Sequence, residues 1–288
     1  MPSIKWRGTL DQLSWFTEFV QNGDQAMSLA VSVDAFSHPP HDNALFRRVL
    51  EHAMAALEDA QVSSEPYCHF YAENVLPTDF FRELIANFPD RSNYVPLNLK
   101  VWVRENGEST RDRLVFTEEL FGRLSEEQCL FWRTVTDVLA SDKLRQIAFR
   151  LLAKDVAARF GIKEDEVDEI ETFSRTVLFR DTEAYKIKPH ADGTSRIVTM
   201  MLYLPADLSQ EDLGTSVYVK QPLLKRLGGE TFKEIKRFPY RPNSLSAFAV
   251  NRMRARTSWH GVEQIGPNRG VRNSLLTQYR TNDDGPAY

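Results

Sequence analysis

The sequence predicts a mainly β fold with packed helices, in the form of a sandwich or a jelly roll. Three observations support this fold class. Apolar residues before Gly161 repeat about every four positions, as in helices, and those after it repeat every two, as in strands. The strand candidates are short, and turns at Asp-Gly, Leu-Gly, Gly-Gly and Pro-Asn separate them. About eight short strands at this spacing are typical of a jelly roll, and the preceding helices are expected to pack on its outside.

The chain before Gly161 is expected to be largely helical. Residues 1–65 are interpreted as an N-terminal helical extension, with a stripe formed by Leu45, Val49, Ala53, Ala56, Leu57 and Ala60. A short strand, a turn at Pro77 and a helix follow. Ser125 and Gln128 form a capping-box start for the next helix. Residues 142–160 then form one further helix that ends at Gly161.

The strands are expected in the second half of the chain. The candidates are residues 169–179, 185–190, 196–204, 215–219, 232–238, 243–250, 257–262 and 272–280. Helices between residues 75 and 160 are expected to support these strands, which lie between residues 168 and 281. Residues 66–288 are therefore predicted to form one domain, because neither an internal repeat nor an obvious linker divides them.

Composition, charge and cysteine spacing argue against several classes of protein. The chain has 288 residues and a net charge of −4, which argues against nucleic-acid binding through a broad basic surface. Cys68 and Cys129 lie far apart, so they form no cysteine zinc cluster and indicate no disulfide framework. No apolar run reaches the roughly 18 residues of a membrane span, and the first residues lack a signal-peptide pattern. A cytoplasmic location is expected, and no feature predicts an oligomeric state.

Two histidines and an aspartate in the strand-rich half are candidates for a metal site. His190 and Asp192 are two residues apart, so in an extended segment both side chains point to the same side. His260 is the other histidine of this half, and a jelly roll can return it to the same place. Two histidines and one carboxylate form the facial triad with which non-haem Fe(II) oxygenases hold a co-substrate and O₂. The alternative is that they are ordinary loop and core residues.

An arginine twelve residues after His260 adds a candidate anion site. Arg272 and Ser274 share one face of an apolar strand. An inward arginine needs an anionic partner, because an unpaired buried charge is costly. The distal carboxylate of a dicarboxylate such as 2-oxoglutarate would accept two parallel hydrogen bonds from the guanidinium, helped by the Ser274 hydroxyl. A structural ion pair with Glu171 or Glu263 is the alternative.

Together these residues resemble a known family. His190-Ala-Asp192, His260 and Arg272-Asn-Ser274 are similar to the H-x-D…H…R-x-S pattern of Fe(II)/2-oxoglutarate-dependent oxygenases, and residues 196–204 resemble a strand of the prolyl-hydroxylase-like branch. The resemblance covers roughly residues 168–281, is weaker over 66–90 and does not include the first sixty residues. It implies a double-stranded β-helix of the cupin-like jelly-roll type. It also implies that Tyr203 shares the binding of the distal carboxylate.

The resemblance further implies an activity. Fe(II) would be held by His190, Asp192 and His260, with 2-oxoglutarate and O₂ as co-substrates. The enzyme would hydroxylate an unactivated C–H bond and produce succinate and CO₂. Because Asp192 is present, where related halogenases have a small residue, hydroxylation is favoured over halogenation.

The substrate is expected to be a small polar or anionic molecule, such as an amino acid, a sugar acid or a natural-product intermediate. Lys186 and Lys188 have the strand parity of His190, and Arg111 and Arg113 lie in a basic stretch expected near the mouth of the barrel. These four residues are candidates for substrate binding. The alternatives are that the lysines extend to water and that the basic stretch is a solvated face.

Three alternative functions remain open at this stage. A peptidyl side-chain hydroxylase of the same family would use the same residues. A non-oxidative zinc or manganese enzyme of the cupin type is less favoured, because such sites recruit more histidines and would give Arg272 no purpose. A jelly-roll binding module without catalytic activity would not need three metal-ligand candidates beside an arginine.

Overall fold

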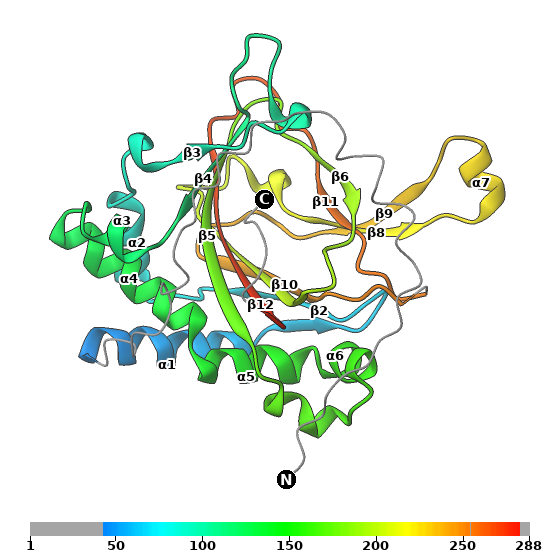
Figure 1. Ribbon diagram of the computed structural model, residues 1–288, viewed down its shortest axis with the longest axis horizontal. Helices are drawn as coiled ribbons and strands as arrows, with labels where there is room; N and C mark the ends of the chain where they lie inside the picture. The colour runs from blue at the N-terminus through cyan, green and yellow to red at the C-terminus, as the bar shows by residue number, and fades with distance from the viewer. Residues whose placement is uncertain (1–42, 254, 283–288) are drawn as a thin grey trace. The chain divides into compact units, whose positions relative to one another are not determined.

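The computed structural model describes residues 43–253 and 255–282 of the chain. Its strands form two antiparallel sheets (Figure 1). The helices are α1 (Ala44–Glu58), α2 (Thr78–Ala86), α3 (Glu118–Phe121), α4 (Glu126–Ala140), α5 (Asp142–Leu151), α6 (Ala153–Phe160) and α7 (Leu223–Leu227). The strands are β1 (Gln61–Ser63), β2 (His69–Glu73), β3 (Val95–Pro96), β4 (Arg111–Val115), β5 (Phe173–Asp181), β6 (Ile187–His190), β7 (Arg196–Tyr203), β8 (Ser216–Lys220), β9 (Phe232–Arg237), β10 (Ser244–Ala249), β11 (His260–Val262) and β12 (Arg272–Arg280).

The strand order identifies the fold as a double-stranded β-helix. The large sheet has the order β1-β2-β10-β7-β12-β5-β4-β3, and the small sheet has the order β6-β11-β8-β9. From β5 to β12 the chain passes repeatedly from one sheet to the other, and every pairing in both sheets is antiparallel. This winding is a jelly roll. The fold class predicted from the sequence is therefore confirmed.

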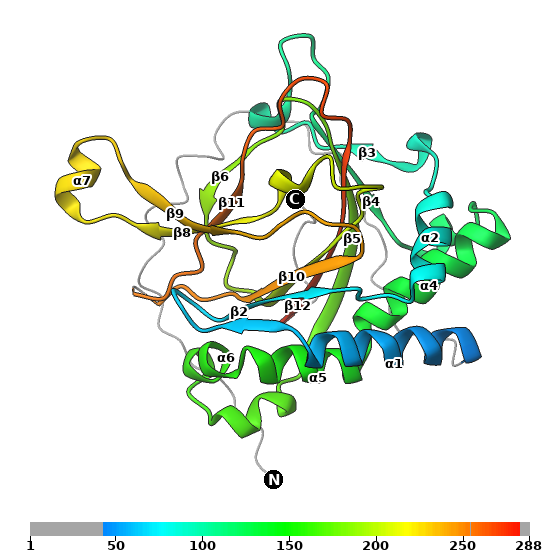
Figure 2. The same cartoon turned by 180° about the vertical axis from the view of Figure 1, so that it is seen from behind.

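A row of leucines on the outer face of the large sheet explains why the helices pack there. Strand register places Leu245 opposite Leu202, Leu202 opposite Leu275, Leu275 opposite Leu178 and Leu178 opposite Leu114. All five are buried in the core that also contains the inward faces of α1, α4 and α5. Burial of one such side chain stabilises a protein by about 1.5–3 kcal/mol. Figure 2 shows α1 and α5 along this side of the sheet.

The opposite face of the large sheet turns toward the small sheet. Inward positions on neighbouring strands are directly opposite one another, as with Met201, Leu276 and Val177. Tyrosines and phenylalanines fill much of the space between the sheets, with Tyr203, Tyr240 and Phe248 among the buried members. The candidate site residues of the large sheet lie on this inner face.

The structure differs from the expected secondary structure in three places. The helix expected over residues 142–160 is two helices, α5 and α6, because Leu152 between them leaves helical geometry at φ −109° and ψ 11°. Residues 111–115 form β4 in the large sheet, where a charged stretch was expected. The connection between β8 and β9 contains α7 and projects from the small sheet (Figures 1 and 2).

The expected helix boundaries at Ser125 and Gly161 agree with the structure. Ser125 and Gln128 form the reciprocal capping box at the start of α4, and Gly161 ends α6 in the left-handed conformation at φ 67°. Helix α1 and strand β1 precede residue 65, yet α1 packs in the main core and β1 pairs with β2. The first 42 residues of the expected extension lie outside the described residues. No helix within the described ranges is long and apolar enough to span a membrane.

Candidate metal centre

The fold brings His190, Asp192 and His260 together. His190 ends β6 and His260 begins β11, and the pairing of these strands places the two residues directly opposite each other. Oδ1 of Asp192 lies 3.9 Å from Nε2 of His190 and 4.0 Å from Nε2 of His260. One potential ligand atom from each of the three residues lies within 4.8 Å of the others. This spacing suits three ligands of one metal ion.

Both imidazole rings are oriented by backbone carbonyls. Nδ1 of His190 lies 3.1 Å from the carbonyl oxygen of Lys188, and Nδ1 of His260 lies 2.9 Å from that of Ser258. If each Nδ1 carries the proton and donates it to its carbonyl, each Nε2 keeps its lone pair for a metal. The donor set of two imidazole nitrogens and one carboxylate fits Fe(II).

Asp192 is fully buried and is held by two donors. The Thr199 hydroxyl donates to Oδ2 at 2.7 Å, and Nη1 of Arg196 donates to Oδ1 at 3.2 Å. Burial alone would raise the pKa of Asp192, but His260, Arg196, His190 and the Thr199 hydrogen bond together lower it. The carboxylate is therefore ionised, as a metal ligand must be.

The environment of His190 also favours the form that binds a metal. Burial, followed by the neighbouring His260, lowers the pKa of His190 to about 4. The imidazole is therefore neutral at physiological pH. A neutral imidazole next to an ionised carboxylate is the protonation state that metal binding requires.

A cavity of about 180 Å³ connects the candidate metal centre with Arg272. His190, Asp192 and His260 line it, as does the Arg272 guanidinium. Most of its other lining side chains are apolar: Leu97, Trp102, Phe179, Ile187, Met201, Phe248, Val262 and Leu276. On β12, Gln278 accepts a hydrogen bond from Arg196 beside Asp192, and Arg272 lies at the other end of the strand. The cavity thus combines metal-ligand candidates, a cation and an apolar wall.

Arg272 faces inward, as expected, but its protein partner is neither glutamate considered from the sequence. Its Nη1 donates to Oδ2 of Asp181 at 2.9 Å, and its Nε donates to the carbonyl oxygen of Leu213 at 2.7 Å. Ser274 Oγ lies 3.5 Å from Nη1, at the limit of a hydrogen bond. Burial works against the positive charge, but Asp181 and neighbouring tyrosines raise the pKa of Arg272. The guanidinium therefore stays charged inside the cavity.

Tyr203 and Arg113 lie on the inner face of the sheet but do not line the cavity. The Tyr203 hydroxyl lies 2.9 Å from Oγ1 of Thr215 and 2.8 Å from Oγ of Ser246. Its ring centroid lies 5.7 Å from Cζ of Arg272. The Tyr203 ring therefore lies near the Arg272 guanidinium, while its hydroxyl is hydrogen-bonded to Thr215, which lines the cavity. Arg113 is half-buried on β4.

The two lysines lie outside the cavity, because the expected strand alternation is broken. Lys186 and Lys188 are both exposed, whereas Ile187 lines the cavity. An irregularity in the pairing of β6 with β11 aligns His260 with His190 but Val262 with Ile187. The strands also approach closely there: a Cβ added to Gly261 would lie 2.6 Å from the carbonyl oxygen of Ile187. Lys186 and Lys188 therefore do not share the cavity-facing side with His190, although simple alternation along the strand had predicted that they would.

The structure adds details of the site that the sequence did not reveal. Arg111, a candidate for substrate binding, is buried in the cavity wall and faces Asp181. Thr199 lies in the strand predicted over residues 196–204, and Asp181 lies two residues beyond the strand predicted over residues 169–179. Both side chains are on the inner face of the sheet. Their specific partners depend on cross-strand register, which the sequence does not reveal.

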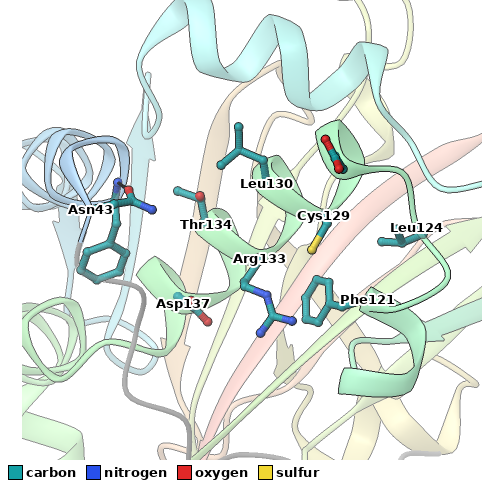
Figure 3. Close-up of a pocket in the computed structure, with 10 residues that line it drawn as sticks. Asn43, Phe121, Leu124, Cys129, Leu130, Arg133, Thr134 and Asp137 are labelled. Atoms are coloured by element: carbon teal, nitrogen blue, oxygen red, sulfur yellow. Dashed lines mark hydrogen bonds between the residues drawn. The ribbon is translucent and has the colours of Figure 1, made fainter.

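A second, larger hollow of about 440 Å³ lies beside α4 (Figure 3). Its lining includes Cys129, Arg133 and Asp137. Arg133 is already engaged, because it forms two 2.7 Å hydrogen bonds with Glu118 and lies over the ring of Phe121. No histidine lines this hollow among the described residues. The combination of metal-ligand candidates and a buried cation is found in the smaller cavity.

Comparison with known proteins shows that the structure of this chain is similar to several solved structures. No family model and no curated protein matches the chain. A prolyl hydroxylase from Trichoplax adhaerens, solved with a hypoxia-inducible-factor peptide, is 12% identical with a TM-score of 0.46, over 82% of this chain and 90% of that one. A prolyl-4-hydroxylase from Pseudomonas putida is 16% identical with a TM-score of 0.44, over 81% and 99%. HygX from Streptomyces hygroscopicus, solved with nickel and 2-oxoglutarate, is 13% identical with a TM-score of 0.44, over 75% and 83%.

Proposed function

We propose that the protein is an Fe(II)/2-oxoglutarate-dependent oxygenase that hydroxylates an unactivated C–H bond. One observation carries this proposal: a single cavity in the double-stranded β-helix is lined both by the His190, Asp192 and His260 group and by the buried guanidinium of Arg272. A metal alone would need only the first group. A 2-oxo dicarboxylate needs both, because one end chelates the metal and the other needs a cation.

In this proposal the metal ligands are His190, Asp192 and His260. When bound, Fe(II) and 2-oxoglutarate supply the activation of O₂, with succinate and CO₂ as by-products of substrate oxidation. The carbonyl oxygens of Lys188 and Ser258 would hold the two rings with Nε2 available to the metal. Thr199 and Arg196 hold the Asp192 carboxylate, so the ligand set is fixed before the metal arrives.

The remaining residues bind the co-substrate and exclude water. Arg272 binds the distal carboxylate, and its neighbour Ser274 and the ring of Tyr203 support the guanidinium. Trp102 closes part of the cavity and is fixed by a 3.2 Å hydrogen bond from its Nε1 to the carbonyl oxygen of Lys186. The apolar wall keeps bulk water from the reacting centre.

A small substrate fits this cavity best. Its volume of about 180 Å³ is below the roughly 300–1,000 Å³ of pockets that bury drug-sized ligands. Part of that space is taken by the co-substrate, so the group that is oxidised has to be small. An amino acid, a sugar acid or a compact natural-product intermediate meets this limit. A peptide could offer only a side chain to it.

The test is Fe(II)-dependent formation of succinate from 2-oxoglutarate in air. The purified protein is given Fe(II), 2-oxoglutarate and pools of amino acids, sugar acids, natural products or short peptides, with Asp192→Ala as the control. We expect wild-type protein to form succinate above the control, with a further increase in the pool that contains the substrate. Equal succinate formation by the two proteins in every pool would contradict the proposal.

A further inference from the structure

Three charged residues form a continuous row across the inner face of the large sheet. Strand register places Asp181 of β5 directly opposite Arg272 of β12 on one side and Arg111 of β4 on the other. Oδ2 of Asp181 lies 2.9 Å from Nη1 of Arg272, and Oδ1 lies 3.3 Å from Nε of Arg111. All three side chains are buried, and both guanidinium groups line the cavity.

This row carries one more positive than negative charge. Asp181 is shared between two arginines, so it can neutralise only one of them. Asp112 is the neighbouring acid, but it points to the other face of the sheet and pairs with Arg180 at 3.1 Å. Among the described residues, Asp192 is the carboxylate that lines the cavity, and it belongs to the candidate metal centre. An uncompensated buried charge is costly, so the row is suited to receive one anion from a ligand.

The two guanidinium groups also present donors to such an anion. Nη2 of Arg272 has only a weak contact, at 3.8 Å from the sulfur of Met201, among the described residues. Arg111 is held in place by aromatic rings, since its Cζ lies 3.7 Å from the ring centroid of Phe179 and 4.8 Å from that of Tyr185. It also donates a hydrogen bond to the Tyr185 hydroxyl. A rigidly held planar donor is well suited to a carboxylate.

We propose that Arg111 is a second anchor for the distal carboxylate of the co-substrate, acting together with Arg272. The inference rests on the proposed function. It adds that β4 contributes to dicarboxylate recognition, although β4 lies far in sequence from the metal-ligand candidates and from Arg272. Asp181 keeps the two guanidinium groups side by side and leaves the pair with a single positive charge for a single carboxylate.

The test compares two 2-oxo acids in Fe(II)-loaded protein under anaerobic conditions. Calorimetry measures the dissociation constant of 2-oxoglutarate and that of 2-oxopentanoate, which has the same carbon chain without the distal carboxylate. The variant is Arg111→Met, which leaves the Asp181–Arg272 pair intact and charge-balanced. Arg111→Lys retains the charge without the planar fork. Arg180→Met is the matched control, because it removes an arginine from an ion pair on the opposite face of the same strands.

We expect Arg111→Met to weaken 2-oxoglutarate binding by about 10- to 100-fold, the range for losing a charged hydrogen bond. Binding of 2-oxopentanoate should stay unchanged, Arg111→Lys should be intermediate, and Arg180→Met should resemble wild type. Arg272→Met combined with Arg111→Met should cost less than the product of the single effects, because both act on one carboxylate. Unchanged 2-oxoglutarate binding in Arg111→Met would overturn the inference alone. Failure of wild-type protein to bind 2-oxoglutarate would overturn the proposed function as well.

Discussion

The pairing of β6 with β11 places His190 directly opposite His260, with their ring centroids 4.3 Å apart. Each ring has its Nδ1 next to a backbone carbonyl oxygen two residues earlier, so the two Nε2 atoms face the same point. Asp192 reaches that point from the turn after β6, where its nearer oxygen is about equally distant from both rings. This convergence of two strand residues and one residue of the following loop is the basis of the metal-binding predictions below.

Loss of a ligand should remove the metal. His260→Ala and Asp192→Ala are each expected to reduce Fe(II) from about one ion per chain to near zero, because the triad provides all three protein ligands. Metal analysis after anaerobic reconstitution and desalting measures this. His52→Ala is the control, since His52 is an exposed histidine bonded to the carbonyl oxygen of Asn74. Full retention of iron in Asp192→Ala would show that the ligand set is wrong.

Loss of the hydrogen bond to Asp192 should lower the affinity for the metal without abolishing its binding. Thr199→Val keeps the shape of the side chain but removes the 2.7 Å hydrogen bond to Oδ2. Changes to such supporting groups typically weaken metal affinity by about 10- to 100-fold. Competition with a chelator of known affinity measures the change. Thr277→Val is the matched control, because Thr277 is buried in the same sheet and hydrogen-bonds to Thr176 rather than to Asp192. The idea fails if both variants lose the same affinity.

Removal of the principal anchor should raise the co-substrate requirement. Arg272→Ala is expected to increase the KM for 2-oxoglutarate by about 10- to 100-fold, as for a lost charged hydrogen bond. The kcat at saturation should fall much less, because the metal ligands are intact. Steady-state succinate formation over a range of 2-oxoglutarate concentrations measures both values. A KM equal to that of wild type would show that Arg272 serves only its ion pair with Asp181.

The leucine row should be important for stability. Leu202→Ala is expected to destabilise the protein by about 2–5 kcal/mol, the usual cost of such a truncation in a packed core. Leu202 is fully buried and lies opposite Leu245 and Leu275. Leu224→Ala is the control, because Leu224 is 84% exposed in α7 and should change the free energy of unfolding very little. Urea denaturation of both variants measures the difference, and an equal small effect would contradict the packing described here.

The sequence was most informative where a local pattern decides the structure. Strand alternation and turn residues predicted the jelly roll, and the spacing of His190 and Asp192 predicted that both face one point. His260 could be added because it is the other histidine of the strand-rich half. Their convergence is observed, while their role as iron ligands stays a prediction.

The sequence was least informative where register or irregular geometry decides the structure. The irregular pairing near Gly261 placed Ile187 in the cavity and Lys186 outside it, against simple alternation. Strand β4 was missed because Arg111 and Asp112 break its apolar pattern, and the β5 residues that these two side chains face are not visible in the sequence. A cross-strand partner such as Asp181 becomes visible only when the strands are aligned.

The most direct test of the central claim is an anaerobic titration followed by visible absorption. Fe(II) and then 2-oxoglutarate are added to metal-free protein, with Asp192→Ala measured in parallel. We predict that wild-type protein develops the weak charge-transfer band of a 2-oxo acid chelated to Fe(II), and that the variant does not. A wild-type protein that binds a divalent metal but shows no band would contradict the oxygenase and favour a non-oxidative cupin-type enzyme.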